Sequence, residues 1–151
     1  MTTIKIADYL NTDLILFLDP ATRDEALNII IDTVHNAGKL DRPENFYQAI
    51  LDREKLVSTG IGMGVAIPHA KLAAYDHFFI AIAILKHGVD WHAIDGSPVR
   101  LVFMIGGPDD KQTEYLQLLS LLTQILKNEE RRKKIFTLNS PDAIMQLFQN
   151  L

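Results

Sequence analysis

The chain has 151 residues, of which 48% are apolar and 23% are charged, and its formal net charge is −4. A chain of this length can bury a proper core, so we expect a single domain over residues 1–151. The acidic balance disfavours a nucleic-acid binder, and the lack of cysteine excludes disulfides, thiolate metal sites and cysteine nucleophiles.

The apolar runs in the sequence are too short to place the chain in a membrane. The first ten residues contain no apolar signal core. The longest apolar run, Phe78 to Leu85, falls far below the length of about 20 residues that spans a bilayer. We therefore expect a cytoplasmic protein without membrane insertion.

The N-terminal part of the chain predicts a short element and then a capped helix. Residues 4–17 have mixed apolar spacing, which favours a strand, or a short helix followed by a strand. Thr22 and Glu25 form a capping box, in which the hydroxyl and the carboxylate satisfy free N–H groups at the helix start. The helix that follows has apolar residues at helical spacing, and Gly38 ends it as a left-handed cap.

A second helix is predicted to begin at Pro43, which suits a first helical turn, and to run to about Lys55. Arg53 lies in its last turn. Further along, Phe78 to Leu85 and Val99 to Ile105 are nearly continuous apolar runs, which are typical of strands buried on both faces. A loop and not a helix joins these two strands, so we expect a mixed sheet.

More helices are expected after these strands. The first runs from about Lys111 to Leu126. Its predicted apolar stripe consists of Leu116, Leu119, Leu122, Thr123 and Leu126. Asn128 can cap a short basic helix that continues through Phe136, and Ser140 can cap a last helix. Strands interleaved with helices predict an α/β layered domain.

The stretch from Arg53 to Leu72 concentrates the unusual chemistry of the chain. A glycine at every second position from Gly60 to Gly64 allows positive φ and close backbone approach. We expect these glycines to form a loop whose free amide N–H groups make an anion-binding concavity. The short apolar run after them reads as a buried strand, which Pro68 ends because it lacks an N–H donor. His69 is therefore expected at a strand end, beside groups that attract anions.

His69 is the candidate nucleophile of this stretch. A neutral imidazole can attack without a separate strong base at neutral pH, and a phosphoryl group on a ring nitrogen can leave again readily. Phosphoryl transfer needs charge stabilisation, which the loop amides and the hydroxyls of Ser58 and Thr59 could supply. The planar guanidinium of Arg53 suits bidentate contact with phosphate. Together these residues predict phosphate chemistry on the imidazole or recognition of an anionic ligand.

Each of these residues also has a simpler interpretation when it is taken alone. A histidine after a strand is commonly a hydrogen-bonded structural residue, and Arg53 can serve as a helix-dipole partner or a surface charge. Ser58 and Thr59 can be ordinary cap or turn residues. The combination within one short stretch favours the functional interpretation.

Other motifs in the sequence point to less specialised roles. The glycine pattern lacks the preceding strand and the following helix of a dinucleotide fingerprint. His77, His87 and His92 do not show the spacing of a metal site, so we expect no metal and no cofactor. Arg131 to Lys134 is interpreted as a solvated basic helix, and Trp91 as a side chain that packs inward.

The stretch from Arg53 to Leu72 closely resembles the signature of the fructose/mannitol-type IIA domains of the bacterial phosphotransferase system (PTS). The nitrogen-regulatory branch of this family looks nearest. The matching segments are Arg53–Glu54, Ser58–Gly62 and Gly64–Ala70. The resemblance implies a single IIA domain with a mixed sheet flanked by helices on both faces. It also implies a phosphotransferase that is phosphorylated on Nε2 of His69, with Arg53 as the phosphate-contacting arginine.

The partners follow from the same resemblance. It implies that phosphohistidine on HPr, or on the nitrogen-branch counterpart of HPr, donates the phosphoryl group. The chain would then pass it to a IIB domain, or signal its phosphorylation state to a regulated transporter or kinase. A purely regulatory binding module without onward transfer stays open as an alternative, and so does a small-anion or nucleotide-binding domain.

Two residues depart from the family pattern. Many members carry a second histidine near the start of the long helix, where this chain has Tyr115. We expect Tyr115 to line the pocket, where its hydroxyl can donate a hydrogen bond to phosphate but does not titrate near pH 7. Met63 stands where an asparagine is common, which predicts either loop packing or an apolar side chain that is exposed or faces a partner.

Overall fold

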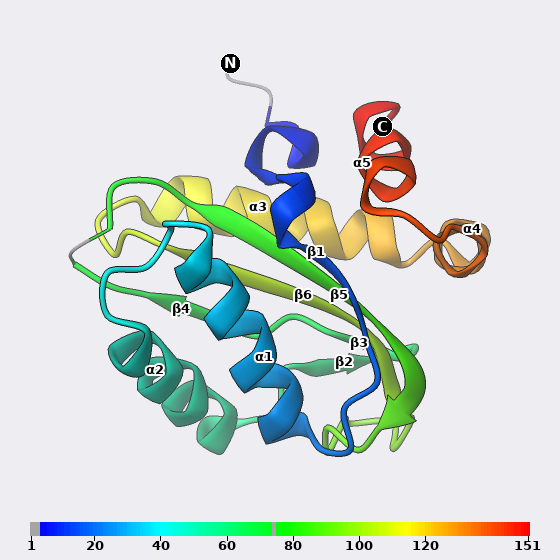
Figure 1. Cartoon of the computed structure of the whole chain (residues 1–151), viewed down its shortest axis with the longest axis horizontal. Helices are drawn as coiled ribbons and strands as arrows, with labels where there is room; N and C mark the ends of the chain where they lie inside the picture. The colour runs from blue at the N-terminus through cyan, green and yellow to red at the C-terminus, as the bar shows by residue number, and fades with distance from the viewer. Residues whose placement is uncertain (1–3, 74) are drawn as a thin grey trace.

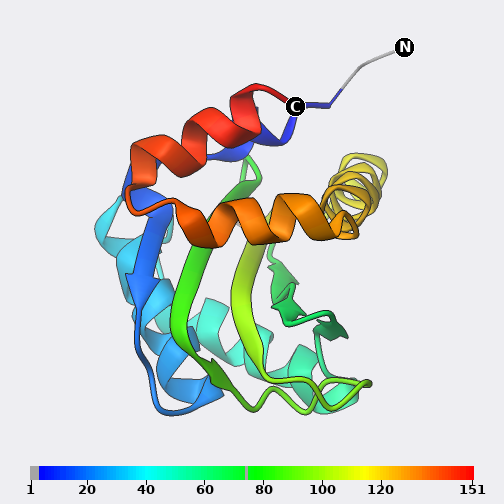
Figure 2. The same ribbon diagram turned by 90° about the vertical axis from the view of Figure 1, so that its right-hand side faces the viewer.

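Helices cover both faces of a twisted sheet. The computed structural model describes residues 4–73 and 75–151. The first three residues of the N-terminal stretch that was examined for a signal core lie outside the described residues. Figure 1 shows α1 (Arg23–Asn36) and α2 (Pro43–Leu56) on one face of the sheet. The side view in Figure 2 shows α3 (Gln112–Leu126), α4 (Glu129–Thr137) and α5 (Pro141–Gln149) on the other side of the sheet. The predicted α/β class, with helices on both faces, is confirmed.

The sheet is mixed, as expected. Its strands follow the order β1-β5-β6-β3-β2, and β4 also pairs with β6. The strand bounds are β1 (Ile15–Leu18), β2 (Gly60–Gly62), β3 (Val65–Ala66), β4 (His69–Lys71), β5 (Phe79–Val89) and β6 (Val99–Gly107). The long central pair β5 and β6 is antiparallel, whereas β1 runs parallel to β5, and β3 and β4 run parallel to β6. A loop between β5 and β6 permits this antiparallel pairing, since a parallel pair would need a crossover.

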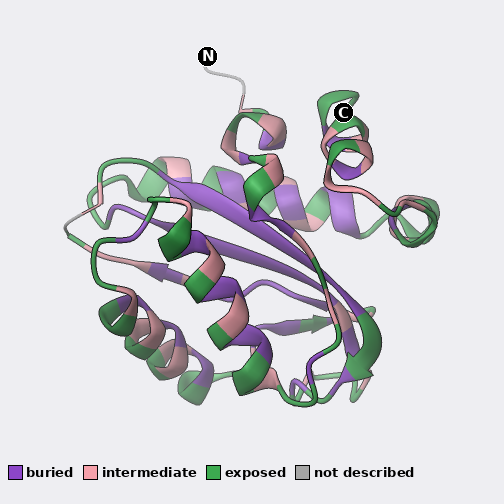
Figure 3. Ribbon diagram, in the orientation of Figure 1, coloured by how far each residue is buried: buried purple, intermediate pink, exposed green. Residues whose placement is uncertain are grey.

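The two sheet faces build two separate clusters of buried side chains. Along β5, Ile80 and Ile82 belong to the cluster under α3 and α5, while the intervening Ala81 and Ala83 belong to the cluster under α1 and α2. Alternation with a period of two puts neighbouring strand residues on opposite faces. Figure 3 shows the consequence, a sheet that is buried along most of its length between helices with exposed outer surfaces.

The N-terminal elements agree with the prediction of a short helix followed by a strand and then a capped helix. Two short 3-10 turns, Ile6–Tyr9 and Thr12–Leu14, precede β1. At the start of α1, the Thr22 hydroxyl accepts a hydrogen bond from the Glu25 amide at 3.1 Å, and the Glu25 carboxylate accepts one from the Ala21 amide at 3.1 Å. These two bonds satisfy amides that a helix start leaves free.

The predicted stripe of α3 is confirmed in its second half, where Leu122 and Leu126 are buried, and is wrong at its start. Leu116, which was expected to face the core, is 52% exposed, whereas Tyr115 and Leu118 are buried. Tyr115 turns inward because its ring packs against Phe78, with 6.1 Å between ring centroids, and against His69. The inward face of α3 is therefore set by the aromatic residue at its start.

The basic segment on α4 has a structural task in addition to its solvated surface. Arg131 donates to the carbonyl of Ile125 at 3.0 Å, and Arg132 donates to the carbonyl of Leu126 at 2.7 Å. Both carbonyls lie in the last turn of α3, where a helix leaves acceptors without partners. Two of the basic side chains thus cap the preceding helix. Within residues 4–73 and 75–151, no helix is long and apolar enough to cross a membrane.

Candidate functional site

His69 is the first residue of β4 and faces away from the core that contains Ala70. Pro68 separates β4 from β3, and both strands pair in parallel with β6. His69 pairs with Ile105 and Lys71 with Gly107, so the two side chains share one face of the short strand. Ala70 is buried on the opposite face. The β6 strand thereby determines where the imidazole lies.

The imidazole of His69 is half-buried and held by a backbone hydrogen bond. Its Nδ1 atom lies 2.7 Å from the carbonyl oxygen of Ile67. A carbonyl oxygen can only accept, so Nδ1 must carry the proton in the neutral ring. The lone pair of the ring is consequently on Nε2. The contact selects the nitrogen that is available for attack.

Arg53 meets this nitrogen directly. Its Nε atom donates to Nε2 of His69 at 3.2 Å, and its Nη1 atom donates to the carbonyl of Val57 at 2.8 Å. The second bond anchors the guanidinium at the C-terminal end of α2. The two residues lie 16 positions apart in the sequence, and the structure brings them together as the sequence led us to expect.

Tyr115 and Lys71 line the same site from α3 and β4. The Tyr115 and His69 rings have centroids 5.7 Å apart. Lys71 places its Nζ atom 4.4 Å from the Tyr115 ring centroid and also bonds to the side chain of Gln112. Sequence reasoning did not select Lys71, although its position two residues after His69 in a strand was the signal that could have found it.

Ser58 and Thr59 are both engaged in hydrogen bonds near the site. The Ser58 hydroxyl donates to the carbonyl of Trp91 at 2.5 Å and accepts from the Gly60 amide at 3.0 Å. The buried Thr59 hydroxyl donates to the carboxylate of Glu54. Their predicted contact with phosphate stays a prediction, and the observed bonds give each hydroxyl a role in holding the loop. Trp91 is fully buried, which confirms that it packs inward.

The glycine-rich stretch forms a hairpin and not an open loop of free amides. Strands β2 and β3 pair in antiparallel fashion, and the turn between them contains Met63 with φ +60° and Gly64 with φ +75°. The Thr59, Gly60 and Met63 amides donate to Glu54, Ser58 and Asp95. These three amides already have acceptors, so the expectation that they are free to bind an anion is wrong.

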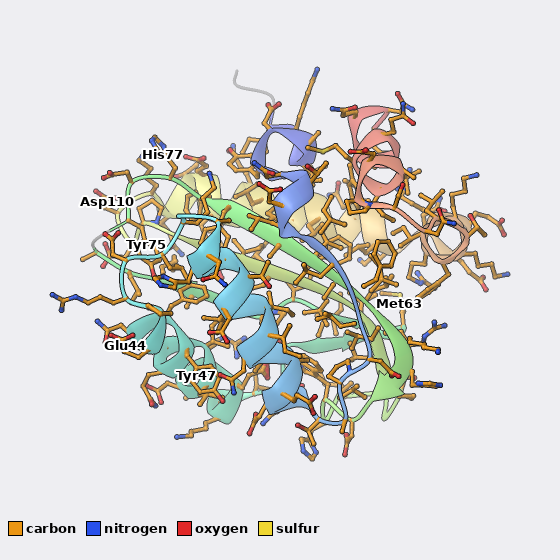
Figure 4. All side chains as sticks on the ribbon, in the orientation of Figure 1. Glu44, Tyr47, Met63, Tyr75, His77 and Asp110 are labelled. Carbon is orange, nitrogen blue, oxygen red and sulfur yellow. The ribbon has the colours of Figure 1, made fainter. Side chains whose placement is uncertain are left out.

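Met63 lies at the exposed tip of this hairpin. Its side chain is 39% exposed, and its sulfur lies 3.5 Å from Nη1 of Arg132 on α4. Figure 4 labels Met63 on the side of the molecule where α4 lies. The exposed alternative for this residue is thus confirmed, with one contact to the basic helix.

The environment of His69 favours its neutral form. Burial lowers the pKa of His69 below its ordinary value of 6.5; the hydrogen bond to Ile67 opposes this change, and the positive charges of Arg53 and Lys71 add to it. Burial also raises the pKa of Tyr115 to about 12, so its hydroxyl keeps its proton at neutral pH. The site therefore combines a neutral imidazole with two cationic side chains and a protonated tyrosine. Among the described residues, no group of three or more His, Cys, Asp or Glu side chains could hold a metal ion.

Sequence comparison gives a match over nearly the whole chain. Residues 8–151 match the family described as "Phosphoenolpyruvate-dependent sugar phosphotransferase system, EIIA 2". The PTS system fructose-specific EIIABC component of Bacillus subtilis is 37% identical over 145 residues, which are 95% of this chain and 23% of that protein. The fructose-specific EIIA component of Haloferax volcanii is 34% identical over 128 residues, which are 85% of this chain and 83% of that protein. The chain thus spans less than a quarter of the first relative and most of the second.

Solved structures show the same fold. The nitrogen regulatory protein IIA-Ntr from Neisseria meningitidis superimposes with a TM-score of 0.88 at 26% identity, covering 95% of this chain and 98% of that one. The mannitol enzyme IIA of Escherichia coli, solved in complex with phosphorylated enzyme IIB, gives a TM-score of 0.78 at 25% identity, covering 94% of this chain and 98% of that one. From its sequence match and its fold, the chain belongs to the EIIA 2 family of the phosphoenolpyruvate-dependent sugar phosphotransferase system.

Proposed function

We propose that this chain is a phosphocarrier that accepts a phosphoryl group on Nε2 of His69. The donor is phosphohistidine on HPr or on its nitrogen-branch counterpart, and the acceptor is a IIB domain, so the carrier works in the cytoplasm. The observation that carries the proposal is the position of Arg53, which points a guanidinium N–H at Nε2 from 3.2 Å. The complex of the similar mannitol IIA with phosphorylated IIB supports the choice of a IIB partner.

The transfer step follows from the orientation of the ring. The lone pair on Nε2 attacks the phosphorus atom of the donor phosphohistidine, and a new P–N bond forms at Nε2. The donor P–N bond breaks, and its electron pair returns to the donor imidazole. Nδ1 of His69 keeps its proton throughout, because the Ile67 carbonyl holds it at 2.7 Å. Because Nδ1 stays protonated while Nε2 bonds to phosphorus, the phosphorylated ring carries a formal positive charge, which the negative phosphoryl oxygens balance.

Arg53 has to change partners during this step. Its Nε–H occupies the lone pair of Nε2 before transfer, and the incoming phosphoryl group displaces it. The guanidinium can then donate to the phosphoryl oxygens, where its planar fork fits better than an ammonium. We further propose that Lys71 and the Tyr115 hydroxyl, which come from neighbouring side chains of the site, donate to the same oxygens. These groups supply the charge stabilisation that phosphoryl transfer mainly requires.

A second candidate function is regulatory binding without onward transfer. It is favoured by the likeness to a nitrogen regulatory protein, at a TM-score of 0.88, and by Tyr115 in the place where a second titratable histidine is common. The two functions differ in what the phosphorylated chain does next. Rapid discharge to a sugar-specific IIB domain would reject the purely regulatory function, whereas a phosphohistidine that persists with every IIB tested would reject the carrier function.

Phosphoryl transfer from HPr to this chain should depend on His69 and Arg53. With phosphoenolpyruvate, enzyme I and HPr, we expect acid-labile phosphate on the wild type, none on His69→Ala, and a rate lower by about 100-fold for Arg53→Lys. His77→Ala and Arg42→Lys change exposed residues and serve as matched controls that should keep the wild-type rate. Full labelling of His69→Ala would contradict the proposal.

The hydroxyl of Tyr115 should assist the phosphorylated state. Tyr115→Phe removes only this hydroxyl, and we expect the initial labelling rate to fall by about tenfold, the loss of one hydrogen bond to a charged group. Tyr47→Phe, on the other face of the sheet, is the control and should leave the rate unchanged. Equal rates for Tyr115→Phe and the wild type would show that the hydroxyl does not reach the phosphoryl group.

The His69 imidazole should titrate below pH 6.5. Burial and the nearby cations disfavour the protonated ring, so removing the Arg53 charge should raise the pKa of His69. A ¹H–¹⁵N NMR titration of the wild type and Arg53→Gln, with N-acetylhistidine amide as an internal reference, measures both values. A wild-type pKa at or above the reference, or a lower pKa in Arg53→Gln, would overturn this electrostatic account.

A further inference from the structure

Glu54, the residue directly after Arg53, has a buried acidic side chain. Its side chain is 1% exposed. A buried carboxylate is costly unless hydrogen bonds and positive charge compensate for the water it has lost. The transfer step described above makes no use of this side chain, so its burial calls for a different explanation.

The contacts of the Glu54 carboxylate within the described residues are all with donor groups. Oε1 accepts from the Thr59 hydroxyl and, at 3.2 Å, from the indole Nε1 of Trp91. Oε2 accepts from the Thr59 amide at 3.1 Å and lies 3.7 Å from Nη1 of Arg23. The same carboxylate therefore ties α2 to the segment before β2, to the loop after β5 and to the start of α1.

A short series of contacts leads from this carboxylate to the imidazole. Thr59, held through its amide and its hydroxyl, accepts at its carbonyl from the Ile67 amide at 3.0 Å. Ile67 in turn accepts at its carbonyl from Nδ1–H of His69 at 2.7 Å. This series of hydrogen bonds thus runs from Glu54 to Nδ1 of the His69 ring. The neighbouring residue Arg53 contacts the other ring nitrogen, Nε2.

We propose that Glu54 is a positioning residue for phosphoryl transfer, acting through Thr59 and Ile67 to hold His69 with its proton on Nδ1 and its lone pair on Nε2. The inference rests on the proposed function, since it concerns the same ring. It assigns Thr59 a role in orienting the nucleophile, and it explains why an acid is buried beside the phosphate-binding arginine. Glu54 itself contacts neither the reacting nitrogen nor the phosphoryl group.

Glu54→Gln tests this role with little change in shape. The amide replaces one acceptor oxygen by an NH₂ group, which cannot accept. With NH₂ at the Oε2 position, the Thr59 amide loses its acceptor. With NH₂ at the Oε1 position, the Thr59 hydroxyl and the Trp91 indole both lose an acceptor. Either arrangement loosens the series that leads to Ile67.

The experiment has two readouts on ¹⁵N-histidine-labelled protein. Long-range ¹H–¹⁵N correlation of the unphosphorylated chain gives the fraction of His69 in the Nδ1–H tautomer, and labelling with phosphoenolpyruvate, enzyme I and HPr gives the transfer rate. For Glu54→Gln we expect a smaller Nδ1–H fraction and a rate lower by about tenfold to a hundredfold. Glu44→Gln, an exposed change on the same helix, and Ile144→Val, in the core on the other sheet face, should keep both wild-type values.

A wild-type tautomer fraction or a wild-type rate in folded Glu54→Gln overturns the inference. If Glu54→Gln does not fold, Thr59→Val, which removes only the hydroxyl contact, is measured in the same way with the same two criteria. If the wild type is not labelled at His69, the proposed function fails, and the tautomer comparison alone then decides the positioning role. The two failures are therefore distinguishable.

Discussion

The hydrogen bond from Nδ1–H of His69 to the carbonyl of Ile67, 2.7 Å long, leaves the ring a single nitrogen with a free lone pair. That nitrogen, Nε2, faces the guanidinium of Arg53. Both features depend on backbone that cannot shift easily, because Ile67 and His69 flank Pro68 between two strands that pair with β6. The sheet thus determines the orientation of the imidazole, which is the orientation that the proposed transfer requires.

Groups on three separate elements then give this ring its chemical character. The end of α2 supplies Arg53, the start of α3 supplies Tyr115, and β4 itself supplies Lys71. Partial burial and positive charge together keep the imidazole neutral, which a nucleophile at neutral pH requires. The same positive charge is what an incoming phosphoryl group needs. In the proposed mechanism, one electrostatic arrangement therefore serves both the neutral resting imidazole and the transfer step.

Features that depend on neighbouring residues in the sequence could be predicted, and features that depend on distant contacts could not. Pro68 and the apolar run before it predicted the strand end at His69, and the helical pattern after Pro43 put Arg53 in a last turn. The use of the glycine-loop amides was mispredicted because one acceptor, Asp95, lies 32 residues beyond Met63. The start of the α3 stripe was mispredicted because Tyr115 packs against His69 and Phe78, two distant residues that the leucine spacing does not reveal.

The nitrogen that carries the phosphoryl group is the most direct test of this account. ³¹P NMR and long-range ¹H–¹⁵N correlation of the phosphorylated, ¹⁵N-histidine-labelled chain distinguish the two phosphohistidine isomers. Since the Ile67 carbonyl holds the proton on Nδ1, the account predicts phosphorus on Nε2 of His69, with Nδ1 still protonated. Phosphorus on Nδ1, or on any other residue, would contradict it.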